Sequence, residues 1–97
     1  MTNEEIWNIG LEERTDELSK LQSEYDRLDV ECRKAEFEKD MYARLRDVNN
    51  AMLYKQKFSE KYEKCSRASE KLTKQKNALE NEISVLKKEI YYINSLM

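Results

Sequence analysis

The residues of this chain that could do chemistry are pairs of neighbouring acids and two cysteines. The acidic pairs are Glu4-Glu5, Glu12-Glu13 and Asp16-Glu17. Paired carboxylates carry out acid–base catalysis only where a pocket that excludes water shifts the pKa of one of them. The surrounding sequence is highly charged, and it contains neither histidine nor a glycine-rich phosphate loop. We therefore expect solvated helix faces here, with no catalytic residue, no enzymatic activity and no cofactor.

The two cysteines, Cys32 and Cys65, are too few for a disulfide framework, and their spacing fits no metal site. Equivalent cysteines would face one another across a parallel helical dimer and could form a redox-sensitive link. Buried thiols also serve as small apolar core residues. We favour the core role for both cysteines and expect no bound metal.

A third chemical feature is a basic stretch between Lys55 and Lys76, where eight bases accompany three acids. Such a stretch could contact nucleic acid, an acidic protein surface or anionic lipid. Its bases are spread around the helix, and acids four residues away, such as Glu60 before Lys64, can pair with them. A solvated flank is therefore favoured, and nucleic acid is not the expected partner.

The composition is that of a long helix. The chain has 97 residues with one glycine and no proline, and 39% of its residues are charged. Turns usually need glycine or proline, so a chain without them has few means of reversing direction. Residues 1–31 carry ten acids and three bases, whereas residues 32–97 carry ten acids and fifteen bases. The charge is thus unevenly divided along the chain.

Two heptad frames are readable, and they define the predicted oligomer interface. The first frame runs through Leu11, Leu18, Leu21, Tyr25, Leu28, Cys32 and Ala35. The second frame runs through Phe58, Tyr62, Cys65, Ser69, Leu72, Lys76, Leu79, Ile83, Leu86, Ile90, Ile93 and Met97. The second frame continues for more than five heptads, which indicates a coiled coil. Ile at position a with Leu at position d favours a parallel dimer.

The two frames are displaced by two residues, and a single four-residue stutter or three-residue stammer cannot produce that displacement. Two explanations are open. In the favoured one, a continuous helix passes through an irregular central segment with altered winding. In the alternative, a helical hairpin turns near Asn49-Asn50, because asparagine can end a helix. The lack of Gly and Pro in this segment argues against the turn.

The predicted fold is therefore all-α: one long continuous helix that forms a coiled coil, most simply a parallel homodimer. The expected segments are an N-terminal cap or contact segment, a first coiled-coil segment, an irregular register-shift segment and a second, regular coiled-coil segment. Their bounds are 1–10, 11–36, 37–57 and 58–97. Thr2 fits the N-cap of the first helix, with Glu5 three residues later.

The expected function is a non-enzymatic coiled-coil oligomerisation segment of a larger scaffold or tether, of the cytoskeletal type found at centrosomes, spindle poles or kinetochores. The alternative is a docking module whose central segment binds a globular cytosolic protein such as a small GTPase or a motor subunit. Candidate contacts with such a partner are Trp7, Met41, Leu45, Val48 and Met52. No run approaches the roughly 20 apolar residues of a membrane span, so a cytoplasmic location is expected. The uncapped C-terminus suggests a fragment of a longer coiled coil.

Overall fold

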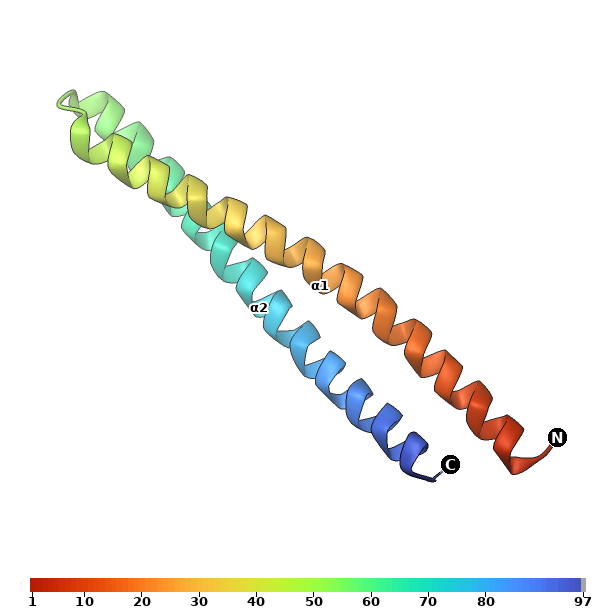
Figure 1. Ribbon diagram of the computed structural model, residues 1–97. Helices are drawn as coiled ribbons and strands as arrows, with labels where there is room; N and C mark the ends of the chain where they lie inside the picture. The colour runs from red at the N-terminus through yellow and green to blue at the C-terminus, as the bar shows by residue number, and fades with distance from the viewer. Residues whose placement is uncertain (97) are drawn as a thin grey trace. The chain divides into compact units, whose positions relative to one another are not determined.

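The computed structural model describes residues 1–96 and contains two long helices joined by a short turn (Figure 1). Helix α1 spans Asn3–Val48 and helix α2 spans Met52–Leu96. The all-α class with long helices is confirmed. The chain adopts the helical hairpin, so the expectation of one continuous helix through residues 37–57 is wrong.

The turn forms without glycine because it needs no left-handed residue. No residue of the described chain has a positive φ. The side-chain Oδ1 of Asn49 accepts a hydrogen bond from the backbone N–H of Ala51 at 3.1 Å, as in an Asx turn. The carbonyl oxygen of Ala51 then accepts the bond from the N–H of Lys55 at 3.0 Å, which begins α2. A missing glycine was therefore no obstacle to chain reversal.

The N-terminus of α1 carries the predicted cap. The Oγ1 of Thr2 accepts a hydrogen bond from the backbone N–H of Glu5 at 3.2 Å, and the carbonyl of Thr2 accepts one from Ile6 at 3.1 Å. These bonds satisfy N–H groups that have no partner within the first helical turn. The helix accordingly begins at Asn3.

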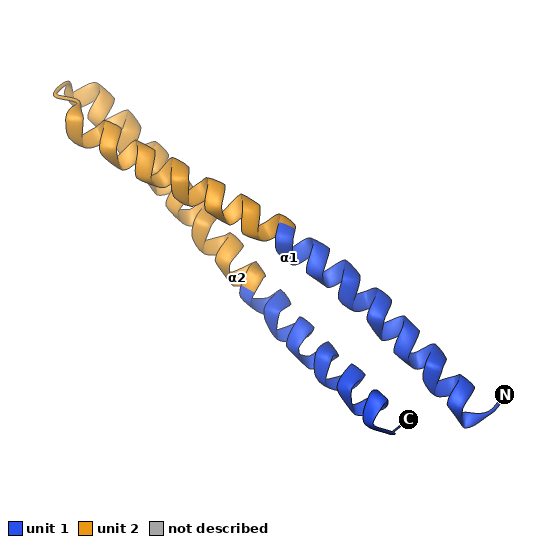
Figure 2. Cartoon of the chain, in the orientation of Figure 1, with its two compact units in different colours: residues 1–26, 77–97 blue, residues 27–76 orange. Residues whose placement is uncertain are grey.

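The chain divides into two compact units (Figure 2). Unit 1 combines residues 1–26 of the N-terminal part with residues 77–97 of the C-terminal part, of which Met97 lies outside the described residues. Unit 2 is the continuous stretch 27–76, which includes the turn. In each unit a segment of α1 lies beside a segment of α2 and runs in the opposite direction. The buried residues are Leu28, Cys32, Ala35 and Ser69 in unit 2 and Ile83 and Leu86 in unit 1.

The first heptad frame continues in α1 almost to the turn. Tyr42, seven residues after Ala35, stacks on Phe58 of α2 with ring centroids 6.3 Å apart. Lys39 and Arg46 of α1 both lie over the ring of Tyr62. The two-residue displacement between the frames therefore needs no altered winding, because the frames belong to different helices.

A designed disulfide tests the hairpin. The Sγ of Cys32 and the Oγ1 of Thr73 lie 3.5 Å apart across unit 2. We expect a T73C variant, made in a C65S background, to form an intramolecular disulfide under mild oxidation, because side chains this close fall within disulfide range. Non-reducing electrophoresis would show a faster-migrating monomer.

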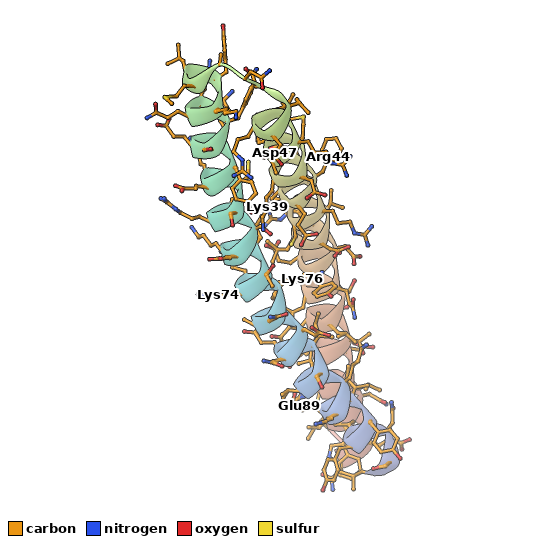
Figure 3. All side chains as sticks on the ribbon, turned by 90° about the vertical axis from the view of Figure 1, so that its left-hand side faces the viewer. Lys39, Arg44, Asp47, Lys74, Lys76 and Glu89 are labelled. Atoms are coloured by element: carbon orange, nitrogen blue, oxygen red, sulfur yellow. The ribbon has the colours of Figure 1, made fainter. Side chains whose placement is uncertain are left out.

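The matched control is K74C in the same background. Lys74 is exposed and points away from α1 (Figure 3), so this variant should form no intramolecular link. Disulfide-linked dimers of T73C without any linked monomer would contradict the hairpin.

Candidate interaction surfaces

The predicted interface residues line the seam between the helices within each unit. Every one of them that the structure describes is buried or half-buried. Besides the buried residues named above, the half-buried ones are Leu11, Leu18, Leu21, Tyr25, Phe58, Tyr62, Cys65, Leu72, Lys76, Leu79, Ile90 and Ile93. Met97 lies outside the described residues. The stripe expected to meet a second chain is thus covered first by the other helix of the same chain.

That cover is incomplete. Among residues 1–96, no large side chain is less than 2% exposed. Each helix covers the other on one side only, so most leucines of the seam remain in partial contact with solvent. Side chains in the core of a packed domain are enclosed by neighbours on all sides. The hairpin therefore has an apolar seam with open flanks.

Lys76 is a charged residue within the seam, and it has a specific partner. Lys76 points toward α1 (Figure 3), and its Nζ donates a hydrogen bond to Oδ1 of Asp29 at 2.6 Å. Arg33 binds the other carboxylate oxygen of Asp29 at 2.9 Å. The hydrogen bond from Lys76, with a smaller contribution from the charge of Arg33, lowers the pKa of Asp29 below its ordinary value of 3.8. The carboxylate thus stays ionised and holds both bases.

The cysteines lie in the seam and are not joined to each other. Cys32 is buried and contacts Thr73, and the Sγ of Cys65 donates a weak hydrogen bond to Oε2 of Glu38 at 3.8 Å. Burial raises the pKa of the Cys65 thiol, and the carboxylate of Glu38 raises it further. Since the thiolate is the reactive form, this environment makes Cys65 a poor nucleophile.

Sequence reasoning missed an aromatic cluster close to the turn in unit 2. Besides stacking on Phe58, Tyr42 has the ammonium of Lys61 at 5.4 Å from its ring centroid. The guanidinium of Arg46 and the ammonium of Lys39 lie 5.2 and 5.6 Å from the ring centroid of Tyr62. Such contacts contribute about 0.5–1 kcal/mol each at exposed sites. Extending the first frame past Ala35 would have placed Tyr42 on the seam.

Two shallow grooves open beside the seam of unit 1. The first is lined by Glu17, Leu21, Asn81, Glu82, Val85 and Leu86. The second is lined by Ile6, Trp7, Gly10, Arg14, Tyr92, Ile93 and Leu96. Trp7, a predicted partner contact, is 40% exposed here. Val85 and Tyr92 are seven residues apart, so both grooves include the same outer stripe of α2.

The second groove is bounded by an ion pair between the helices. The Nε of Arg14 donates to Oε2 of Glu89 at 3.1 Å, and its Nη1 donates to the carbonyl oxygen of Gly10 at 3.2 Å. Both ion-pair partners are more than a third exposed, so the pair itself contributes little to stability. It holds the Arg14 side chain along the groove next to Gly10.

The remaining predicted partner contacts do not form one seam. Met41 is half-buried and Leu45 is 37% exposed, whereas Val48 and Met52 are 76% and 84% exposed on opposite sides of the turn. Leu53 and Tyr54 are also exposed and were not predicted. The apolar run that they form with Ala51 and Met52, directly after the two asparagines, was the signal that could have identified them.

No protein-family model, curated protein or solved structure matches this chain. Among residues 1–96, neither helix has a stretch apolar enough to cross a membrane, and no three metal-ligating side chains are grouped to hold an ion.

The Asp29–Lys76 pair predicts a pH dependence of stability. Because folding lowers the pKa of Asp29, the pair stabilises the hairpin above about pH 4 and is lost as the pH falls through the lower folded-state pKa. We expect D29N to lower the unfolding temperature at pH 7, as followed by circular dichroism. The difference from the wild type should shrink below pH 4. A difference that persists unchanged at pH 2 would contradict this assignment.

The environment of Cys65 predicts slow alkylation. In a C32S background, we expect an E38Q substitution to speed the reaction of Cys65 with iodoacetamide at pH 8. The reason is that Glu38 raises the pKa of the thiol, so its removal increases the thiolate fraction. Mass spectrometry at timed intervals gives the rate. The matched control is E80Q, which removes an exposed acid of unit 1, away from Cys65, and should leave the rate unchanged.

Proposed function

We propose that this chain is a non-enzymatic oligomerisation segment: a helical hairpin that packs against a second copy of itself within a larger scaffold or tether. The observation that carries this proposal is the apolar seam whose flanks stay open to solvent. A helix pair that covers its own stripe only partly is stabilised further by any helix that covers the rest.

The small buried core supports a need for a partner. Only five apolar residues among residues 1–96 are buried, and two of these are Cys32 and Ala35, which are small. Chains of this size bury a modest fraction of their surface, and their stability is a small difference between large terms. In a four-helix bundle each seam layer gains side chains from two further helices. Pairing of two hairpins would supply them.

The groove beside Val85 is the surface we assign to this pairing. Val85 is 56% exposed and lies outside the heptad stripe that the hairpin buries. Leu21 is half-buried and Leu86 is buried, whereas Glu17 and Glu82, which also line the groove, are exposed. An apolar centre with a polar rim is the usual anatomy of a protein–protein interface.

The chemistry of the described residues favours this role over catalysis. The acidic pairs near the N-terminus are exposed, with Glu4, Glu5, Glu12 and Glu13 all on the solvent side of α1. The environment of Cys65 suppresses its thiolate. The cytoskeletal setting expected from the sequence stays a prediction, because no contact within the hairpin bears on it.

A single substitution tests the proposed pairing. We expect the wild-type chain to sediment as a dimer in the micromolar range and V85D to sediment as a monomer. Burial of a valine contributes about 1.5–3 kcal/mol, and the change occurs in both copies, so the dissociation constant should rise at least about tenfold. Sedimentation equilibrium measures the masses, and circular dichroism checks that helix content is unchanged.

The matched control is V30D. Val30 is 65% exposed on α1 and lines neither groove, so this variant should still form dimers. The sedimentation experiment is repeated with the T73C variant after its disulfide with Cys32 has formed. This linked hairpin cannot open into one extended helix. A monomeric wild type, equal effects of V85D and V30D, or a linked hairpin that no longer dimerises would each overturn the proposal.

A further inference from the structure

The turn in unit 2 is surrounded by apolar side chains that nothing in the hairpin covers. Val48, Met52 and Leu53 are 76%, 84% and 75% exposed, and Tyr54 is 51% exposed. These four residues, here called the turn patch, lie within seven positions of one another on either side of residues 49–51. Singly exposed apolar residues are normal on protein surfaces, but a contiguous exposed cluster marks an interaction site.

Bases flank the turn patch on both helices. Residues 44–60 contain Arg44 and Arg46 before the turn, Lys55 and Lys57 after it, and two acids, Asp47 and Glu60. Arg46 and Asp47 pair with each other at 3.3 Å, so the remaining charge of this segment is positive. Arg44 points away from α2 (Figure 3), on the outside of the hairpin. The exposed apolar side chains thus lie among positive charges.

We propose that the turn patch binds the surface of an anionic lipid bilayer. Met52, Leu53 and Val48 would enter the boundary between headgroups and acyl chains, where apolar side chains gain from burial. Tyr54 has the amphipathic ring that favours the membrane–water interface. Lysine and arginine stems can lie along the apolar surface while their charged ends reach lipid phosphates. Weak apolar insertion and a polybasic site together supply the two signals that stable membrane attachment requires.

The positive charge of the patch favours an occupant that is itself anionic. An anionic bilayer supplies negative charge and an apolar layer at once, and each base near such a surface strengthens binding about fivefold. The turn patch is also distinct from the Val85 groove in unit 1, so this site does not depend on the proposed self-association.

Vesicle sedimentation tests the proposal with the full chain. Sucrose-loaded vesicles of phosphatidylcholine alone are compared with vesicles of phosphatidylcholine and phosphatidylserine at about three to one. We expect the wild type to bind the mixed vesicles and to bind phosphatidylcholine alone at least about tenfold more weakly. Binding should also weaken as the salt concentration rises, because exposed charges are screened.

Two double variants and their matched controls separate the two contributions. M52S/L53S removes apolar side chains, and its control V30S/F37S removes side chains of similar exposure from the outer face of α1. K55E/K57E reverses two charges beside the turn, and K87E/K88E reverses two exposed charges of unit 1. We expect each turn variant to weaken binding at least about tenfold and each control to bind within about twofold of the wild type.

Circular dichroism of all four variants shows whether the helices are intact, and a variant that loses helix is replaced by the single substitution at Leu53 or Lys57. A wild type that sediments with no vesicle would overturn the proposal. So would equal losses in the turn variants and their controls. Binding to a soluble polyglutamate peptide without binding to mixed vesicles would also overturn it, in favour of an acidic protein partner.

Discussion

Burial of one narrow apolar stripe is the interaction on which this hairpin depends. The backbone hydrogen bonds of each helix are internal to that helix, so they do not hold α1 to α2. What joins the two helices is mainly the contact of seam residues such as Leu28 and Ile83, together with a few polar and aromatic contacts. Apolar burial contributes about 25 cal/mol per Å², and a stripe of one or two side chains per turn offers limited area. The open grooves follow from the same constraint, because two helices cannot enclose their own seam.

An apolar stripe alone does not specify how the helices align, because layers of leucine and isoleucine can slide past one another by a heptad. Two polar features specify the alignment. The three-residue connection limits the register close to the turn, and the Lys76–Asp29 bond specifies it at the far end of unit 2. Ala35 and Ser69, which are both small, are buried in the stretch between these two features. The turn and the contacts farther along the helices therefore favour the same alignment of α1 and α2, as a unique pairing requires.

The heptad pattern predicted which residues are covered, because the 3-4 spacing selects one side of a helix whatever lies against it. It could not identify which helix covers the stripe, since a helix of a second chain and the other helix of this chain can bury the same residues. The displacement between the two heptad frames was the signal for the hairpin. A single continuous helix must keep its heptad frame or change it by a stutter or stammer. The heptad frames of two separate helices need have no fixed relation to each other. The lack of glycine argued against the turn, yet Asn49 and Ala51 form it with ordinary φ values.

The apolar surfaces that remain exposed in the two units differ in the charge around them, and this difference governs what can cover each. The Val85 groove of unit 1 is lined in part by Glu17 and Glu82, whereas the turn patch of unit 2 lies among Arg44, Lys55 and Lys57. Association driven by apolar burial is strengthened or unchanged by salt, while attraction to an anionic surface is screened by it. Raising the salt concentration should therefore favour pairing of hairpins through the groove and release the turn from lipid, so that one variable separates the two interactions.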